Sequence, residues 1–273
     1  MTLTILGGTG FIGSHLARAL TRAGVDHTVP ARDADLRGRD LGAVIYSIGL
    51  TADFRARPLD TVEAHVSRLA RLLESSTLTS LTYLSSTRIY RRCPSPATED
   101  ASLRVEPKVA DDLYDISKIM GEAVALSARC PTRVVRLSNV YGPDGASSNF
   151  LASLLRDALV DGEICLRTSL GSWKDYVSVD DVVRLLPTIA LHGSSSVYNL
   201  ASGSNVTHRA VTDRIAALTG CRIRVADGAL GSQPPTIAID RVRDEFGFHP
   251  ASVLEDLPGL VSHYAAMFAG TGT

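Results

Sequence analysis

A tyrosine and a lysine, Tyr114 and Lys118, stand four residues apart in a segment with helical periodicity. This spacing places both side chains on one face of a helix. A lysine ammonium beside a phenol favours the phenolate and lowers the pKa of the tyrosine from its usual value of about 10. Such a tyrosine can act as a general acid or base near neutral pH. The pair therefore predicts proton transfer to or from a substrate oxygen, and a solvated helix face is the alternative interpretation.

Three hydroxyl residues, Ser85, Ser86 and Thr87, lie at the end of the strand-like segment Leu81–Ser85. In an open α/β sheet, ligands bind in the crevice outside the carboxyl ends of the strands. We expect one of these hydroxyls to hydrogen bond the substrate oxygen that Tyr114 protonates. The alternative is a cluster of hydroxyls that only satisfies a turn.

Glycines recur at three-residue intervals near the N-terminus, at Gly7, Gly10 and Gly13. They lie between a strand-like run and an amphipathic helix. Glycines there permit a tight turn and a close backbone approach to a pyrophosphate, and the helix N-terminus offers free N–H groups and the positive end of a dipole. We therefore assign dinucleotide binding to the three glycines together with Phe11 and Ile12. An ordinary turn between a strand and a helix is the alternative.

Short apolar runs alternate with helix-like segments along most of the chain. The expected strands are Leu3–Leu6, Thr28–Ala31, Ala43–Ile48, Leu81–Ser85, Arg133–Leu137 and Val197–Leu200. The expected helices are Phe11–Ala23, Thr61–Leu73, Leu113–Ala128 and Asp180–Ala190. This alternation predicts an α/β fold with a Rossmann-like, doubly wound parallel sheet.

Only nine residues separate Arg32 from Gly42. A helical crossover between parallel strands needs about 10–12 residues, so we expect a polar loop here and a sheet with a truncated edge after its second strand. The glycines and serines from Gly142 to Ser148 mark a second loop, after which the pattern becomes more irregular. The predicted division is a dinucleotide-binding Rossmann domain of residues 1–145 and 174–200, and a small C-terminal substrate-binding lobe of residues 146–173 and 201–273.

The composition limits the class of partner. The chain of 273 residues has 28 basic and 29 acidic residues and a formal net charge of −1. This balance offers no electrostatic footprint for nucleic acid or for an anionic membrane. The four cysteines are widely spaced, unlike those of a metal site or a disulfide framework. We expect no signal peptide and no transmembrane helix, and hence a cytoplasmic protein without a metal site.

Six motifs, in order along nearly the whole chain, resemble the extended short-chain dehydrogenase/reductase family, which includes the NAD-dependent nucleotide-sugar epimerases and dehydratases. They are GGTGFIGSH (7–15), LSSTRIY (84–90), YDISKIMGE (114–122), RLSNVYGP (136–143), KDYVSVDDV (174–182) and YNLASG (198–203). The resemblance implies hydride transfer at a sugar carbon. It also implies that Ser86, Tyr114 and Lys118 are catalytic, and that Tyr114 and Lys118 contact the cofactor.

The same resemblance implies a substrate site. Asn139 matches an asparagine that contacts the sugar, and Asn149 and Lys174 match positions near the nucleotide diphosphate. The family usually has arginine at position 174, and lysine keeps the charge but loses the bidentate fork. Thr87 and Arg88 stand where resembling dehydratases place two carboxylic acids, which disfavours water elimination. We assign both to substrate binding, Arg88 to an anionic part of the substrate, with a plain surface arginine as its alternative.

Three functions are compatible with these residues. We favour reduction of a nucleotide-linked keto-sugar or a similar polar ketone. The alternative is a nucleotide-sugar epimerase of the C4 type with tightly bound NAD. A non-catalytic dinucleotide-binding protein is disfavoured, because atypical members of the fold with such roles usually lack the Tyr–Lys pair.

One further departure from the family is His65, which stands where an asparagine is common.

The end of the second strand predicts the choice of cofactor. In NAD-preferring Rossmann proteins a carboxylate about 20 residues past the glycine loop binds the ribose 2′-hydroxyl. Ala31 holds that position here, and the next residue is Arg32, whose planar fork suits a 2′-phosphate. Arg37 and Arg39 would add positive potential, whereas Asp33 would favour the 2′-hydroxyl. We therefore expect NADP(H) to be favoured over NAD(H), and an enzyme that accepts both is the alternative.

A homodimer is also expected. Residues 61–73 and 113–128 carry apolar side chains beyond one helix face, for example Ile116, Ile119 and Met120. In resembling enzymes these two helices form a four-helix contact with a second subunit.

Overall fold

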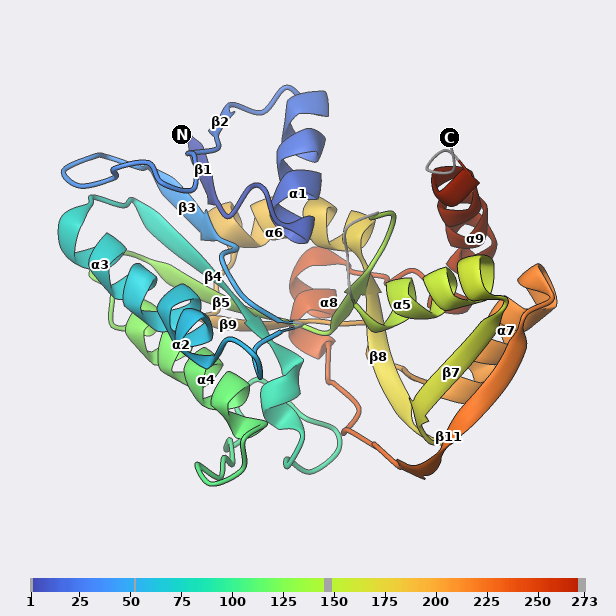
Figure 1. Ribbon diagram of the computed structural model, residues 1–273. Coiled ribbons are helices and arrows are strands. Elements are labelled where there is room, and N and C mark those ends of the chain that lie inside the picture. The colour runs from blue at the N-terminus through green and yellow to red at the C-terminus, as the bar shows by residue number, and fades with distance from the viewer. Residues whose placement is uncertain (1, 52, 145–148, 270–273) are drawn as a thin grey trace.

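A six-stranded parallel sheet forms the core of the computed structural model, which describes residues 2–51, 53–144 and 149–269 (Figure 1). The strand order is β2–β1–β3–β4–β5–β9. The strands are β1 (Leu3–Leu6), β2 (His27–Thr28), β3 (Ala43–Tyr46), β4 (Ser80–Ser86), β5 (Thr132–Leu137) and β9 (Val197–Leu200). Every residue of β1 and β3 is buried, as expected for apolar strands covered on both faces. The predicted α/β fold is confirmed.

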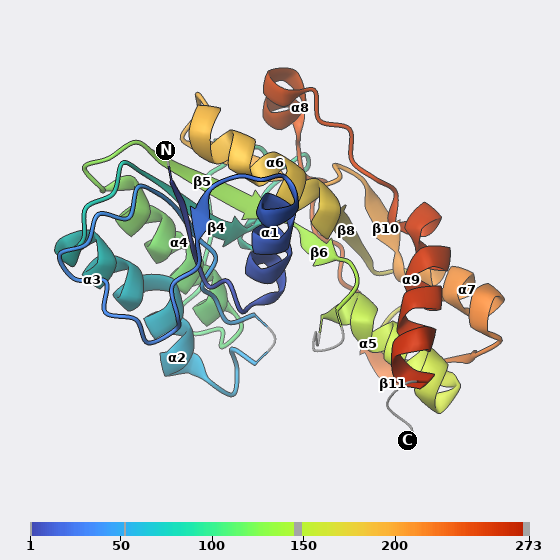
Figure 2. The ribbon, with the colours of Figure 1, turned by 90° about the horizontal axis from the view of Figure 1, so that it is seen from above.

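Helices cover both faces of this sheet (Figures 1 and 2). On one face lie α1 (Phe11–Arg22) and α6 (Val179–His192). On the other face lie α2 (Pro58–Val62), the π-helical turn η1 (Glu63–Ser67), α3 (Arg68–Ser75) and α4 (Asp112–Leu126). Successive residues of β3 point to opposite sides, so that Ile45 packs in the core with α1 and α6, and Tyr46 packs in the core with α3 and α4. This is the doubly wound arrangement.

The sheet ends at β2. A regular Rossmann half has a further strand and helix beyond this point, whereas residues 33–41 form a loop with turns and one isolated bridge. The loop runs back along the end of α3, where the Gly38 N–H donates to the Ser75 carbonyl at 2.7 Å. β2 is shorter than the predicted strand Thr28–Ala31, because Pro30 has no N–H to give to the ladder. The predicted truncation of the edge is confirmed.

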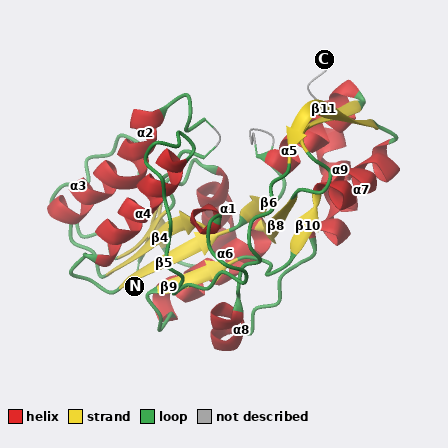
Figure 3. Ribbon diagram, turned by 90° about the horizontal axis from the view of Figure 1, so that it is seen from below, coloured by secondary structure: helices red, strands yellow, loops and turns green. Residues whose placement is uncertain are grey.

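A smaller lobe extends from the sheet and has its own apolar core (Figures 1 and 3). Its strands are β6 (Asn139–Tyr141), β7 (Glu163–Thr168), β8 (Trp173–Ser178), β10 (Asn205–Thr207) and β11 (Arg222–Leu230). Its helical segments are α5 (Phe150–Arg156), the π-helical turn η3 (Asp157–Asp161), α7 (His208–Thr219) and α9 (Val253–Ala269). β6 follows directly after β5 and pairs with β8, so the lobe begins where the large sheet ends.

One segment that the sequence division places in the lobe returns to the large sheet. α8 (Asp240–Phe246) packs beside β9, and Val242 and Phe248 belong to the core shared by the sheet, α1 and α6. The division at residues 145, 173 and 200 stays a prediction. The predicted loop residues Gly145, Ser147 and Ser148 lie outside the described residues.

α4 approaches the π-helical turn η1 unusually closely. The predicted helix Thr61–Leu73 is the middle of a longer helical stretch, α2–η1–α3, which widens at η1. The hydroxyl of Tyr83 donates to the carbonyl of His65 at 3.2 Å, within this turn. A Cβ at Gly121 of α4 would lie 2.2 Å from that hydroxyl and 2.6 Å from that carbonyl oxygen. Only glycine at position 121 therefore permits α4 to lie this close to η1.

Across the described ranges, no helix combines the length and apolar content needed to span a membrane. The same ranges contain no group of three or more histidine, cysteine, aspartate or glutamate side chains that could hold a metal ion.

Candidate active site

Tyr114 meets the hydroxyl residues at the carboxyl end of β4. Its side chain is 3% exposed, and hydrogen bonding by the side chains of Ser86 and Thr51 acts to lower its pKa. Ser86 ends β4, and its Oγ also accepts from the N–H of Arg88 at 3.2 Å, which starts the 3₁₀ turn η2 (Thr87–Tyr90). Thr87 is half-buried in this turn. The structure thus brings Tyr114 and Ser86 together and adds Thr51, while their catalytic role stays a prediction.

Lys118 lies one helical turn after Tyr114, on the same side of α4, and is buried. Its Nζ donates to the carbonyl of Leu84 at 2.9 Å. A Cβ placed on Gly49, just beyond β3, would lie 3.5 Å from this Nζ. Burial lowers the pKa of Lys118 to about 7, although the carboxylate of Glu122 acts in the opposite direction. The ammonium therefore lies beside the end of β3, in surroundings that disfavour its charge.

The protonation state of Tyr114 differs from the expectation based on its spacing from Lys118. Burial raises the pKa of Tyr114 above its usual value, because the phenolate loses its hydration. The hydrogen bonds from Ser86 and Thr51 and the charge of Arg88 act in the opposite direction. The tyrosine is therefore protonated near neutral pH in this structure, which is the form that donates a proton to a ketone oxygen.

His65 is fully buried behind Tyr114, and its hydrogen bonds define its tautomer. The Leu50 N–H donates to Nε2 at 3.2 Å, so Nε2 carries no proton. Nδ1 lies 2.8 Å from the hydroxyl of Ser117, which itself donates to the Tyr114 carbonyl at 2.8 Å. Nδ1 must therefore donate to Ser117. Burial, followed by the charge of Lys118, lowers the pKa of His65 to about 2, so the ring is neutral.

The glycine loop is held by close contacts between backbone atoms, and it leaves room for a dinucleotide. Gly7 has a φ of +91°, and a Cβ there would lie 2.8 Å from the backbone of Ser47. The Gly10 N–H donates to the Gly7 carbonyl at 2.9 Å, and α1 begins at the next residue, Phe11. A Cβ on Gly13 would lie 2.3 Å from the same carbonyl oxygen. Gly7 and Gly13 are thus required by close backbone contacts, a Cβ on Gly10 would lie 3.3 Å from the Gly7 carbonyl oxygen, and the cradle fits a pyrophosphate.

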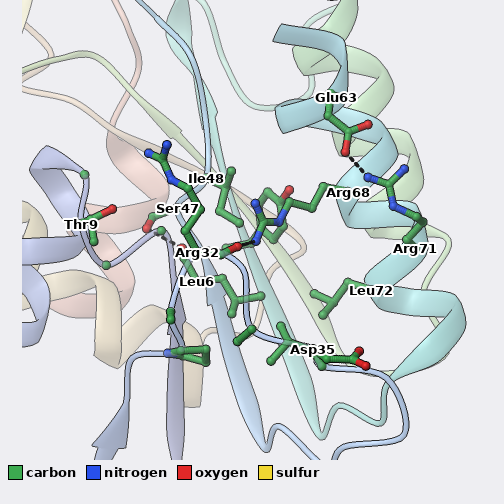
Figure 4. Close-up of a pocket in the computed structure, with 18 of the residues that line it drawn as sticks. Leu6, Thr9, Arg32, Asp35, Ser47, Ile48, Glu63, Arg68, Arg71 and Leu72 are labelled. Atoms are coloured by element: carbon green, nitrogen blue, oxygen red, sulfur yellow. Dashed lines mark hydrogen bonds and ion pairs between the residues drawn. The ribbon is translucent and has the colours of Figure 1, made fainter. Parts of the chain in front are cut away.

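A cavity of about 610 Å³ lies between this loop and α3 (Figure 4). Arg32, Arg68 and Arg71 line it from two sides, and the truncated loop contributes Asp35 and Arg37. Two of these arginines have carboxylate partners: Arg37 pairs with Asp35, and Arg71 pairs with Glu63. In Figure 4, Arg68 points towards Arg32 and donates to its backbone carbonyl.

Arg32 and Arg68 are therefore the arginines of this cavity without a carboxylate partner among the residues that the structure describes. Asp33 is exposed and does not line the cavity. The volume and the glycine cradle suit a dinucleotide, whose adenosine end would lie near these two arginines.

Lys174, on β8, is a largely buried cation on the lobe side of the site. Its Nζ lies 5.2 Å from the ring centroid of Phe150 at the start of α5. Burial lowers the pKa of Lys174, and the charge of Arg88 adds to this effect. Lys174 in turn helps burial to lower the pKa of His208 to about 4. An anionic ligand between the lobe and the sheet would relieve this repulsion.

The two asparagines of the predicted substrate site contact the backbone of the lobe. The side-chain amide of Asn139, on β6, donates to the Asp175 carbonyl at 2.8 Å. Asn149 Oδ1 accepts from the Ala152 N–H at 2.9 Å and so caps the N-terminus of α5. Both side chains stabilise the junction between sheet and lobe in this structure, and their contact with a substrate stays a prediction.

Residues 3–201 match the model of the NAD dependent epimerase/dehydratase family. The chain belongs to this family. The resemblance that the six motifs indicate is thereby confirmed, and the protein is an enzyme that works with a nicotinamide dinucleotide. The matched range contains the whole six-stranded sheet, the glycine loop and the Tyr114–Lys118 pair.

Relatives with different reactions are about equally similar to this chain. A dTDP-4-dehydro-6-deoxy-D-allose reductase from Streptomyces bikiniensis is 24% identical over 298 aligned residues, which cover 91% of each chain. A UDP-glucose 4-epimerase from Azospirillum brasilense is 24% identical over 307 residues, covering 90% of this chain and 86% of the epimerase. Among solved structures, MoeE5 in complex with UDP-glucose and NAD has a TM-score of 0.84 at 21% identity and covers 98% of this chain and 100% of MoeE5. The last match establishes a shared fold.

Three residues of the site have no counterpart in the sequence prediction. Thr51 and Phe54 follow β3 in a segment without periodic pattern, and only the folded path of the chain places them on Tyr114. Arg68 lies within a predicted helix. The recurrence of arginine at positions 68 and 71 is a signal that could have indicated a basic helix face towards the strand ends.

The neutral, buried state of His65 predicts a specific acid sensitivity. The folded pKa of about 2 lies below the unfolded value of 6.5. The unfolded state therefore binds more protons between these values, and stability falls as the pH falls below 6.5. Between pH 8 and pH 5 the unfolding free energy of the wild type should fall by about 2 kcal/mol more than that of His65→Asn. Urea unfolding at both pH values measures it. The exposed His249→Asn is the matched control, and an equal pH-dependent loss in His65→Asn and wild type would contradict the assignment.

Proposed function

We propose that this enzyme reduces a ketone on a nucleotide-linked sugar. The observation that carries the proposal is the buried, protonated Tyr114, one helical turn before Lys118, whose Nζ would lie 3.5 Å from a Cβ on Gly49 in the lining of the dinucleotide cavity. A bound nicotinamide dinucleotide supplies the hydride. Tyr114 donates its proton to the carbonyl oxygen as the alcohol forms, and Ser86 hydrogen bonds the same oxygen. Lys118, next to Gly49, would contact the nicotinamide ribose.

A nucleotide sugar is the proposed substrate because of the cations on the lobe side. Lys174 is largely buried and has no carboxylate partner in the described part of the chain, and the charge of Arg88 also disfavours its ammonium. A diphosphate would neutralise this repulsion. Asn139 and Asn149 would contact the substrate at the same junction. The reductase relative acts on a dTDP-linked sugar by its name, and MoeE5 was solved with UDP-glucose.

The epimerase alternative rests on the relative from Azospirillum brasilense. Reduction and epimerisation use the same tyrosine, and they differ in whether the dinucleotide is exchanged or retained. Dehydration is disfavoured, because Thr87 and Arg88 replace the carboxylic acids that water elimination requires. Identification of the dinucleotide retained on purification distinguishes a reductase from an epimerase.

The proposal also includes the cytoplasmic location expected from the cysteines, all four of which are free thiols.

Replacement of the proton donor tests the proposed chemistry. Tyr114→Phe should lower the rate of hydride transfer by about 10²–10⁴-fold, because a general acid is lost while the ring and its packing stay. The change in dinucleotide absorbance at a fixed concentration of dTDP-linked keto-sugar measures the rate. Dinucleotide affinity should be unchanged, which separates lost chemistry from lost folding. A rate within a few-fold of wild type would exclude Tyr114 as the donor.

NADP(H) is the proposed cofactor. Arg32 and Arg68 face the cavity from the loop after β2 and from α3, without carboxylate partners in the described ranges. Ala31 occupies the position of the ribose-binding acid, and Asp33 does not line the cavity. A 2′-phosphate would therefore meet two guanidinium groups without carboxylate partners, while Asp35 and Glu63 of the same cavity are paired with Arg37 and Arg71. Charge-assisted hydrogen bonds from arginine are the strong contacts for such a group.

The proposed cofactor preference depends on Arg32. Arg32→Ala should weaken NADPH binding by about 10–100-fold, as expected for the loss of a charge-assisted hydrogen bond, and should leave NADH binding nearly unchanged. Calorimetric titration of both dinucleotides measures the two affinities. Arg39→Ala is the matched control, because Arg39 belongs to the same loop but does not line the cavity. Equal affinity of the wild type for NADH and NADPH would overturn the preference.

A homodimer is proposed from an apolar surface on α2, α3 and α4, which lie side by side (Figure 1). Apolar residues recur there at intervals of three or four and are partly or fully exposed: Leu59, Val62, Val66, Ala70, Leu113, Ile116, Met120 and Ala123. Leu59 is 81% exposed and Met120 is 52% exposed. Two such surfaces related by a two-fold axis would bury each other in a four-helix contact.

A charge in this surface should separate the subunits. Met120→Asp should convert the dimer to a monomer at micromolar concentration, because the carboxylate would be buried without a partner in the contact. Sedimentation velocity measures the mass. Leu230→Asp, at an 80% exposed position on β11 of the lobe, is the control and should remain dimeric. A monomeric wild type would contradict the dimer.

A further inference from the structure

The guanidinium of Arg88 lies against the ring of Tyr114. Its Cζ is 5.2 Å from the ring centroid of Tyr114 and 4.7 Å from that of Phe54, whose ring itself packs against Tyr114 at 5.4 Å. Arg88 is thus in the range of a cation–π contact with both rings. Such a contact is stronger when the ring carries more negative charge, so it stabilises the phenolate form of Tyr114 relative to the phenol.

A carboxylate and a backbone carbonyl hold Arg88 in this position. Its Nε lies 3.2 Å from the buried carboxylate of Asp115, the residue after Tyr114. Its Nη2 donates to the Asp111 carbonyl at 3.2 Å, just before α4. The side chain is therefore tied to the first turn of the helix that carries Tyr114, and it moves with that helix.

These contacts belong to one connected network of ion pairs around the start of α4. Its members are Arg55, Arg88, Arg91, Arg92, Asp111, Asp112 and Asp115. The four arginines outnumber the three aspartates, so the network carries one net positive charge. Arg88 is the member that faces the ring of Tyr114, since Arg55 packs on Phe54.

The charged and polar groups that face Tyr114 come from every element packed around it. α4 contributes Asp115, with Lys118 one turn farther along the helix, η1 contributes the neutral His65, and η2 contributes Arg88. The polar partners of the hydroxyl are Ser86 of β4 and Thr51 of the segment after β3. Farther off, the charge of Arg88 acts on Lys174 of β8, and Lys174 is not among the groups that act on the pKa of Tyr114.

Lys118 is poorly placed to act on Tyr114 by charge alone. Its Nζ is bonded to the Leu84 carbonyl, and burial lowers its own pKa to about 7, so it is partly neutral at the pH where an enzyme works. Arg88 stays charged at every such pH. The charge of Arg88 lowers the pKa of Tyr114, and the carboxylate of Asp115 acts against it.

We propose that Arg88 is a positioning residue for proton transfer, which holds a permanent positive charge on the ring of Tyr114 and so favours its phenolate. The proposal rests on the proposed role of Tyr114 as proton donor. In this proposal Arg88 acts through the tyrosine and not by direct contact with an anionic part of the substrate. In this protein a guanidinium therefore supplies part of the electrostatic support that the sequence spacing assigns to Lys118.

The test measures the ionisation of Tyr114 directly. In enzyme saturated with NADP⁺ and labelled with ¹³C at tyrosine Cζ, the Tyr114 resonance is the one absent from Tyr114→Phe. Arg88→Met should move its titration about one pH unit higher, because an opposite charge at this distance is worth about that much or more. Arg88→Lys keeps the charge and should stay nearer to wild type. Arg55→Met is the control, since Arg55 pairs with Asp111 and packs on Phe54 but not on Tyr114, and it should leave the titration unchanged.

The outcomes separate this proposal from the proposed function. An unshifted titration in Arg88→Met overturns the role of Arg88, whatever the reaction is. A shift of equal size in Arg55→Met also overturns it, because a general loosening of the network would then be the cause. Normal hydride transfer by Tyr114→Phe would remove the proposed function but leave the titration result intact.

Substrate contact by Arg88 makes a different prediction. If Arg88→Met weakens binding of UDP-glucuronic acid but not of UDP-glucose and leaves the titration of Tyr114 in place, Arg88 binds a substrate anion and the proposal fails. Retained NADP⁺ affinity shows that each variant is folded. If Arg88→Met does not fold, Arg88→Gln, which keeps a hydrogen-bond donor for Asp115, should give the same shift.

Discussion

Close packing of α4 against the π-helical turn η1 is the constraint on which the site depends. α4 carries Tyr114 and Lys118, and η1 carries His65, so the distance between these two elements sets the position of all three side chains. The missing Cβ of Gly121 allows the approach, and the hydroxyl of Tyr83 satisfies the carbonyl that the wide turn exposes. A π-helical turn inside a longer helix is rare and locally unfavourable, and such turns recur at functional sites. Here it turns an imidazole towards the back of the tyrosine.

The site also contains cations that the protein alone does not neutralise. Lys118 and Lys174 are both largely buried, and burial lowers the pKa of each. A buried charge without a partner destabilises the folded chain. An anionic dinucleotide on one side and an anionic substrate on the other would remove this cost. The free protein is thus less stable than its core packing permits, and binding recovers the difference.

The sequence predicts most of the fold, because the signals are local. Buried apolar runs such as Leu3–Leu6 identify strands, helical periodicity identifies α1 and α4, and a gap too short for a crossover identifies the truncated edge. The pairing of Tyr114 with Lys118 follows from helix geometry alone. Contacts made by irregular segments could not be predicted in this way. The approach of Thr51 to Tyr114 and the bond from Lys118 to the Leu84 carbonyl depend on the folded path of the backbone, for which no spacing rule exists.

The truncated edge has a consequence for the time that a dinucleotide spends on the enzyme. Beyond β2 the adenosine end would be covered by a loop of nine residues, most of them exposed, where a complete Rossmann half would provide a strand and a helix. Less apolar surface is therefore removed from water at that end, so the barrier to departure is lower. A reductase consumes one reduced dinucleotide for each product and must release the oxidised form before the next cycle, whereas an epimerase regenerates its own. Loss of the covering helix would shorten the residence time of the spent dinucleotide, and rapid exchange is an advantage only in the first of these two cycles.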